Sequence, residues 1–252
     1  EHPRKCMSML PGLDVSYAQG ANLPWSRMRE DGLRFVFSRV GQGTRIIDQT
    51  FLPNVNAARE ESFETGGYLL FEADADPLEQ ARQFHRLAAP HVELQPMFDL
   101  ERVGFRGVDP KIIVKNSALW IAETEQLWGQ RVLLYTCISD WLALGNPNDC
   151  DELTRCDLFA AHYGVSKPAI PAPWAQRGWS YWQWDGDGGK RLPDGRDCDF
   201  VWRAESPTTQ APPRHEVKFD EWVSGLDLTG LARDADWACW RDLGHPDALF
   251  LK

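Results

Sequence analysis

Short apolar runs alternate with longer amphipathic stretches along the first 200 residues, and this alternation constrains the fold more than any other feature. Eight runs have strand length: residues 10–16, 33–40, 64–72, 94–101, 131–137, 157–163, 179–184 and 196–202. Helix-like stretches lie between them at about 50–62, 77–89, 109–128, 139–144 and 151–155. In 109–128 a period close to 3.6 residues relates Ile112, Ile113, Leu119, Trp120, Glu123 and Leu127. Repeated strand–helix–strand order predicts an α/β protein with a parallel sheet.

Eight strands in a chain of 252 residues suggest closure of that sheet into a barrel. The last three runs leave little room for helices, so we expect the alternation to degrade toward the C-terminus. The stretch "ESPTTQAPPRH" is rich in Pro, Thr and Ser, which is typical of a linker or strap. We therefore predict a barrel over residues 1–205, a strap over 206–213 and a C-terminal extension over 214–252. The extension is short, and we favour docking on the barrel over a separate binding module.

Charge and composition exclude several classes of function. The net charge is −10, which argues against nucleic-acid binding because phosphate contacts need a basic face. Gly41-Gln42-Gly43 is too short for a phosphate-binding loop and lacks the Gly-Lys-Ser/Thr that follows in one. No run of about 18 apolar residues is present, so we expect no membrane insertion. Without CxxC or His-x-x-x-His spacing we expect neither a metal site nor a cofactor.

The six cysteines are compatible with disulfides in an exported protein. Cys150 and Cys156 lie close together in a polar stretch and form the best local pair, whereas Cys137 and Cys198 are interpreted as buried thiols. The sequence starts at Glu1 without a Met or an apolar leader, which is typical of a mature or trimmed chain. We expect a secreted or periplasmic protein.

Acidic residues gather at strand ends, where parallel barrels carry their active sites. These acids are Asp14 in the first run, Asp99 and Glu101 at the end of the fourth, Asp140 after the fifth, and Asp197 and Asp199 in the eighth. Asp140 is interpreted as a helix cap.

Asp99 and Glu101 are two residues apart, so on a strand they share one face and Leu100 takes the other. A single acid at a strand end is usually a cap or a surface charge. Two crowded carboxylates repel, and the less solvated one holds a proton near neutral pH. A general acid beside an ionised partner has this requirement, and glycoside hydrolysis uses such a pair.

Aromatic residues cluster at the same strand ends: Tyr17, Tyr68, Phe71, Tyr135, Tyr163, Trp182 and Trp184. Trp182 and Trp184 also share a face. Indole and phenol rings stack on the apolar faces of sugars, so we predict that this rim binds a saccharide. The alternative, that about half of these rings belong to the core, stays open.

Eight segments in a fixed order carry a resemblance to a known family: "GLDVSYAQG", "DQTFLPNVNAAR", "GGYLLF", "PMFDLE", "LLYTC", "FAAHYGV", "PAPWAQRGWSYWQW" and "RDCDF". Over roughly residues 10–203 the chain resembles glycoside hydrolase family 25, the Chalaropsis-type lysozymes. The resemblance implies a TIM-like (β/α)5(β)3 barrel, in which three strands with few helices follow five β/α units. It also implies a bacteriolytic N-acetylmuramidase, and we expect the protein to be a monomer. Its substrate would be the β-1,4 bond from N-acetylmuramic acid to N-acetylglucosamine in peptidoglycan strands.

The resemblance places the family's catalytic acids on Asp14, Asp99, Glu101 and Asp197, and Asp199 stands where Asn is common. From their chemistry we expect Glu101 to be the general acid and Asp99 to stay ionised and stabilise a cationic sugar or an oxazolinium formed by the substrate's N-acetyl group. Asp14 and Asp197 would orient groups and tune the central pKa values. A direct nucleophile would instead need a carboxylate separation of about 5–5.5 Å, and the sequence leaves both mechanisms open.

Departures from the family pattern lie on the rim. Tyr17 and Ala18 replace His and Trp, Leu70 replaces a His, and Arg39 stands where Lys is usual. We include Arg39 and Asp199 among the predicted substrate-binding residues.

The segment "EADADP" adds Glu72, Asp74 and Asp76 near the cleft. These acids motivate the hypothesis that the rim repels stem-peptide carboxylates or favours deacetylated sugars. A glycan-binding barrel without catalysis and a different barrel hydrolase, such as a chitinase or an amidase, are the remaining alternatives.

Overall fold

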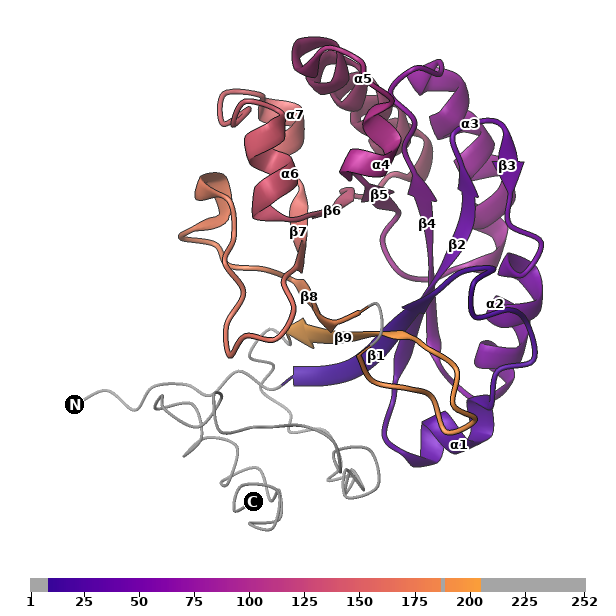
Figure 1. Cartoon of the computed structure of the whole chain (residues 1–252). Helices are drawn as coiled ribbons and strands as arrows, with labels where there is room; N and C mark the ends of the chain where they lie inside the picture. Colours follow the sequence, from indigo (N-terminus) through magenta and orange to yellow (C-terminus); the bar gives the residue numbers. More distant parts are fainter. Residues whose placement is uncertain (1–8, 187–188, 205–252) are drawn as a thin grey trace.

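The computed structural model describes residues 9–186 and 189–204 (Figure 1). The predicted strap at 206–213, the extension at 214–252, and Cys6 and Cys239 lie outside the described residues.

The strands form one closed barrel. They are β1 Met9–Val15, β2 Phe35–Gln42, β3 Ile46–Ile47, β4 Glu64–Leu70, β5 Met97–Asp99, β6 Leu133–Thr136, β7 Asp157–Ala161, β8 Tyr181–Asp185 and β9 Asp199–Ala204. Eight of the nine close on themselves in the order β1-β9-β8-β7-β6-β5-β4-β2, because β1 also pairs with β2. The short β3 pairs antiparallel with β2 as a hairpin. The predicted TIM-like α/β barrel is confirmed.

The direction of the last strand differs from the all-parallel sheet predicted from the alternation. β9 runs antiparallel to both of its neighbours, β1 and β8, whereas the pairs from β4 to β8 are parallel. A parallel neighbour needs a crossover of a dozen or more residues, usually a helix, and no helix lies in the described residues between β8 and β9. β9 therefore begins at the barrel end where the other strands finish.

Helices cover the outside of the barrel, and all of the α-helices in the described residues lie between β1 and β7 along the chain (Figure 1). They are α1 Trp25–Glu30, α2 Phe51–Glu60, α3 Pro77–Ala88, α4 Arg102–Phe105, α5 Pro110–Trp128, α6 Ile138–Ala143 and α7 Asp151–Thr154, with 3-10 turns η1 Ala89–His91 and η2 Ala172–Trp174. The five predicted helical stretches are confirmed, while α1 and the one-turn α4 were not predicted.

The longest helix, α5, lies where the apolar period predicts it, but only part of its predicted apolar face is buried. Asp109 accepts from Lys111 N at 2.9 Å, Pro110 opens the helix, and Gly129 ends it with a φ of 64°. These are the usual signals for a helix start and stop. Trp120 is buried as its period suggests, but Ile112 and Leu119 are exposed. The helix was predicted correctly, whereas its buried face was predicted only in part.

Two apolar layers hold the barrel. Outward-facing strand residues such as Leu69, Phe98 and Leu134 pack with the helices. The inside is filled by Phe35, Phe37, Tyr68, Leu94, Met97, Leu133, Phe159, Tyr181 and Val201. Glycine makes room for the inner rings, since a Cβ on Gly66 would lie 2.4 Å from the Phe37 ring.

The cysteine prediction is corrected within the described residues. Cys150 and Cys156 are free thiols: Cys156 Sγ donates to Glu152 O at 3.2 Å, and Cys150 Sγ donates to the Glu152 carboxylate at 3.7 Å. Helix α7 separates the two, and Cys156 turns into the core at the start of β7. Cys198 is buried as predicted, but Cys137 is partly exposed.

No helix in the described part of the chain has the length and apolar character needed to cross a membrane.

Candidate active site

Four acids meet at the mouth of the barrel. Asp14 on β1 lies opposite Asp199, the first residue of β9. Asp99 ends β5, and Glu101 follows in the N-cap position of α4 with extended backbone angles (φ −136°, ψ 162°). The extended backbone continues the strand alternation, so Met97 packs inside the barrel and Leu100 packs outside among the helices. Asp99 and Glu101 thus share the inward face, as their spacing predicts.

Burial and crowding raise the pKa values of the two inner acids. Asp99 is 5% exposed, and its pKa lies well above the usual range because of burial first and then the charges of Glu101 and Asp14, with Arg39 opposing. For Asp14, burial and the charge of Asp199 raise the pKa, and the hydrogen bond from Gln183 opposes them. The raised pKa predicted for one member of the central pair belongs to the less solvated Asp99.

One oxygen of Asp99 stands out in this group. Its Oδ1 is buried and accepts no hydrogen bond from the described residues. A buried carboxylate oxygen without a donor carries a full desolvation cost, so it is a ready acceptor for a cation or an N–H group brought by a ligand.

A buried amide connects Asp14 to two tyrosines. Gln183 Nε2 donates to Asp14 Oδ2 at 2.9 Å. Gln183 Oε1 accepts from the hydroxyls of Tyr135 at 2.7 Å and Tyr163 at 2.6 Å. Gln183 was not predicted as a site residue, although its spacing from Tyr181 in "SYWQW" places both on one face.

A second set of contacts shapes the rim next to β2. Arg39 Nε pairs with Asp48 Oδ2 at 3.1 Å, and the Arg39 guanidinium lies 4.4 Å from the centre of the Tyr17 ring. Asp48, which was also not predicted as a site residue, accepts from Tyr17 N at 2.9 Å. The terminal nitrogens of Arg39 make no hydrogen bond with the described residues. Tyr17 is 65% exposed, which leaves its ring open to a ligand.

Of the remaining predicted rim residues, the tyrosines reach the mouth. Tyr68 is buried there, and its pKa is raised by burial and then by the charges of Asp14, Asp99 and Asp199, with Arg39 opposing. Tyr163 is 47% exposed.

Phe71, Trp182 and Trp184 do not line the mouth, and their prediction as rim residues was wrong. Phe71 faces the helices, is 1% exposed and packs 5.0 Å from Phe98. Trp182 and Trp184 share a face, as predicted, but it is the outer one, because the intervening Gln183 faces Asp14. Trp182 Nε1 donates to His162 O at 2.8 Å. Trp184 packs with the cluster around Leu13 and Trp25 and stacks on Trp202 at 6.0 Å.

Asp197 lies two residues before β9, where its backbone bridges Arg191. Asp199, rather than Asp197, is in register with Asp14 and is the β9-end acid that raises the pKa of Asp14. The catalytic role that the resemblance implies for Asp197 stays a prediction.

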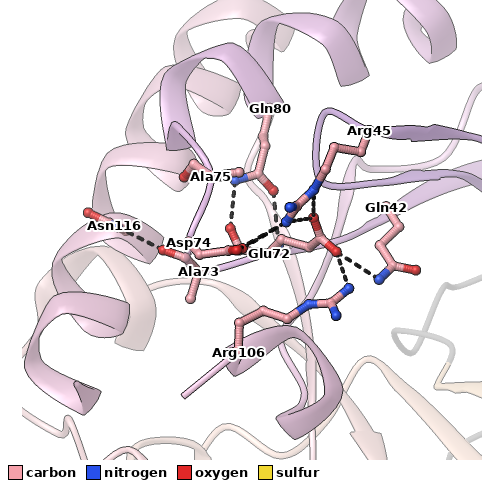
Figure 2. Close-up of polar contacts among 9 residues, drawn as sticks. All are labelled: Gln42, Arg45, Glu72, Ala73, Asp74, Ala75, Gln80, Arg106 and Asn116. Carbon is pink, nitrogen blue, oxygen red and sulfur yellow. Dashed lines mark hydrogen bonds and ion pairs between the residues drawn. The ribbon is translucent and has the colours of Figure 1, made fainter. Parts of the chain in front are cut away.

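The three extra acids after β4 are all engaged in contacts, and Figure 2 shows those of Glu72 and Asp74. Glu72 is buried and ion-paired with Arg45 and Arg106, and Asp74 pairs with Arg45 at 3.0 Å. Asp76 caps α3 by accepting from Leu78 N and Glu79 N. The hypothesis of a rim that repels carboxylates or selects free amines therefore loses its basis, because these acids add little unbalanced charge.

Asp140 caps a helix, although not its own. Its Oδ2 accepts from Arg102 N, the first residue of α4, at 3.3 Å, and its Oδ1 pairs with Arg102 Nε at 3.1 Å. No group of three or more His, Cys, Asp or Glu side chains in the described residues is arranged to hold a metal ion.

Comparisons with known proteins agree with this geometry. A family model described as glycosyl hydrolases family 25 matches residues 13–191. Lysozyme M1 of Streptomyces globisporus is 25% identical over 191 residues, which cover 72% of this chain and 63% of that protein. The uncharacterized protein YegX of Escherichia coli (strain K12) is 24% identical over 178 residues, covering 68% of this chain and 61% of YegX. The chain thus spans less than two thirds of these curated relatives.

Solved structures share the fold. The bacterial lysozyme from Streptomyces coelicolor has a TM-score of 0.68 at 23% identity, covering 79% of this chain and 94% of that one. The muramidase from Trichobolus zukalii has a TM-score of 0.67 at 23% identity, covering 79% and 95%.

Proposed function

The chain belongs to glycosyl hydrolase family 25, and from that premise we propose that it hydrolyses the β-1,4 bond between N-acetylmuramic acid and N-acetylglucosamine in peptidoglycan. The observation that carries the proposal is the Asp99–Glu101 pair, which shares one face at the mouth of the barrel.

In this proposal Glu101 is the general acid. It lies beyond the end of β5 and is only partly buried, so a glycosidic oxygen entering the mouth can reach it. Its proton goes to the leaving oxygen as the bond to the sugar breaks.

Asp99 lies deeper and stabilises the positive charge that develops on the sugar or on an oxazolinium. Its pKa is raised without substrate, but a cation in the mouth favours the ionised form. The unpaired Oδ1 gives that cation, or the N–H of the substrate's acetamido group, an acceptor. Asp14 and Asp197 orient and tune this centre, with Asp199 beside Asp14.

The sugar chain is bound by Tyr17, Tyr68, Tyr135, Tyr163, Arg39 and Asp199 in this proposal. Tyr17 supports the assignment best, because its ring is exposed and lies 4.4 Å from the Arg39 guanidinium. Such a ring is a platform for the apolar face of a sugar.

Digestion of purified sacculi, followed by mass analysis of the muropeptides, tests the proposal. We expect products with reducing N-acetylmuramic ends and none from Glu101→Gln, whose melting temperature should match that of the wild type. Tight glycan binding without product from the wild type would replace the hydrolase with a non-catalytic binding barrel. Products with reducing N-acetylglucosamine ends would contradict the bond specificity.

We also propose that the protein acts outside the cytoplasm, as a monomer, because its proposed substrate is extracytoplasmic and one barrel contains the whole acid cluster. Cell fractionation and sedimentation at several concentrations test these two points.

A further inference from the structure

Glu72 is a buried carboxylate with every oxygen occupied (Figure 2). Its Oε2 accepts from Arg45 Nε at 2.9 Å and Arg45 Nη2 at 2.6 Å. Its Oε1 accepts from Gln42 Nε2 at 2.9 Å and from Arg106 Nη2. The hydrogen bonds from these three side chains outweigh burial, so the pKa of Glu72 lies below its usual range and the carboxylate is charged. Glu72, Gln42, Arg45 and Arg106 thus form a closed network of hydrogen bonds, called the hub below, and not an open binding site.

The backbone of Glu72 is held by hydrogen bonds, as its side chain is. Buried Gln80 on α3 accepts from Glu72 N at 3.0 Å and donates to Glu72 O at 2.9 Å. On the hairpin side, a Cβ on Gly43 would lie 2.5 Å from Glu72 Oε2, so only glycine permits this approach. The carboxylate is therefore held at one place next to the end of β4.

Arg106, the third side chain that donates to the Glu72 carboxylate, belongs to the same segment as Glu101. Arg106 directly follows α4, a helix of one turn with Glu101 at its N-cap position. A single turn is unstable alone, so the position of α4 depends on its contacts. Ala73 N donates to Gly104 O at 2.9 Å, and a Cβ on Gly104 would lie 1.9 Å from Phe71 O. α4 is thus pressed against the chain on either side of Glu72.

The backbone of Arg106 supports a specific role for its side chain. Its φ is 53°, in the left-handed region that side chains other than Asn and Asp rarely occupy. Gly107 follows with a φ of 72°. Strain of this kind persists where the surrounding structure holds the residue in place, and here the Glu72 ion pair does so.

We propose that Glu72 is a positioning residue for the cleavage reaction: through Arg106 it fixes α4, and thereby sets the place of Glu101 at the mouth. Gln42 and Arg45, from the end of β2 and the turn that follows it, hold the same Glu72 carboxylate. The inference rests on the proposed function, in which Glu101 protonates the leaving oxygen. The opposite end of α4 is held in the same manner by Asp140 and Arg102.

Steady-state kinetics of the full chain on soluble, uncross-linked glycan strands tests the proposal. We expect Glu72→Gln and Arg106→Gln each to lower kcat roughly ten- to hundredfold, because a displacement of about 1 Å at a catalytic group has effects of this size. KM should change far less, because neither residue is proposed to bind the sugar. Arg106→Lys, which keeps the charge, should recover part of the lost kcat.

Asp74→Asn is the matched control. Asp74 shares Arg45 with Glu72 but makes no contact with Arg106, so kcat should stay near the wild-type value. The double variant Glu72→Gln/Arg106→Gln should be no slower than the slower single variant, because both changes break one contact. Additive losses would overturn the proposal, as would a kcat unchanged in Arg106→Gln.

Two further outcomes separate this proposal from the proposed function. If the wild type releases no reducing ends, or Glu101→Gln stays active, the proposed function itself fails. If both behave as expected and Arg106→Gln keeps full kcat, only the positioning role fails. Should Glu72→Gln not fold, the partly exposed Arg106 decides the result alone.

Discussion

At the scale of single residues, the mouth of the barrel concentrates negative charge where water is scarce. Asp14 and Asp99 are both buried, and burial raises the pKa of each, with further contributions from the charge of Asp199 on Asp14 and of Glu101 and Asp14 on Asp99. A buried carboxylate without a matching cation is unfavourable when ionised. Burying these two acids therefore lowers the stability of the folded protein. A purely structural role would not require that loss.

Asp99→Asn should raise the stability of the protein near neutral pH by about 1 kcal/mol, since it removes a buried charge, and should abolish activity. Because the folded pKa of Asp99 is raised, the native state binds more protons than the unfolded state. Its contribution to stability is complete below the unfolded pKa and is lost as pH rises through the folded pKa. Melting temperatures between about pH 4 and pH 8 should therefore fall less steeply with pH in Asp99→Asn. A variant less stable than the wild type at neutral pH would contradict this.

Arg39 should set the pH below which kcat/KM falls, which is the acidic limb of the pH–activity profile. Asp99 must be ionised to stabilise a cation, so its raised pKa places that limb above the range of an ordinary aspartate. The Arg39 charge lowers the pKa of Asp99, and Arg39→Gln should therefore move the limb of kcat/KM to higher pH. The position of the limb is the readout, whatever happens to the rate itself. Tyr17→Phe is the control, because it leaves the cation in place; a limb that stays put in Arg39→Gln would remove Arg39 from this role.

At the scale of elements, the site is assembled by strand ends that meet from distant parts of the chain. Gln183 on β8 joins β1, through Asp14, to β6, through Tyr135, and to Tyr163 after β7. The antiparallel β9 brings Asp199 to the same end by its start. The hydrogen-bond network therefore fixes the relative positions of four strands around the mouth.

Gln183→Leu should disrupt this network at several points. Asp14 loses the hydrogen bond that lowers its pKa, and the hydroxyls of Tyr135 and Tyr163 lose their acceptor. We expect a loss of stability of about 1–3 kcal/mol, the cost of buried polar groups left unpaired. Activity should fall as well, because Asp14 becomes harder to ionise. Tyr163→Phe removes one hydroxyl of the network, and a urea titration in which it costs as much as Gln183→Leu would argue against a shared acceptor.

At the scale of the whole molecule, apolar side chains fill the inside of the barrel beneath the acid cluster. Phe37 contacts Phe159 and Tyr181 edge-on, with ring centres 5.8 Å and 5.2 Å apart. These rings and their neighbours fill the interior to the level of Met97, below the acids. The apolar plug excludes water from beneath Asp14 and Asp99, which is the burial that raises their pKa values.

The fit between Phe37 and Gly66 offers a test of that packing. Gly66→Ala should destabilise the barrel by about 1–3 kcal/mol or more, because its Cβ would lie 2.4 Å from the Phe37 ring. Phe37→Ala should cost about 3–5 kcal/mol through the cavity it leaves. In the double variant the added methyl group has room, so the two losses should sum to more than the measured total. Strict additivity in urea unfolding, at an unchanged m-value, would contradict this packing.

The local pattern of the sequence predicts much of this architecture. The eight strands and five of the helices follow from apolar periodicity, which is a short-range property of the chain. The shared face of Asp99 and Glu101 follows from the same period of two. The family resemblance, carried by eight short segments, agrees with the family model over residues 13–191.

Only the tertiary structure decides which face is the inside. A period of two shows that Trp182 and Trp184 share a face, but the closure of the barrel sets that face outward and gives the inward one to Gln183. The direction of β9 depends on a connection from β8 that has no helix in its described residues, and the neutralisation of Glu72 depends on arginines 27 and 34 residues away. Spacing along the chain describes neighbours within one element, whereas charge compensation and burial depend on which elements pack together.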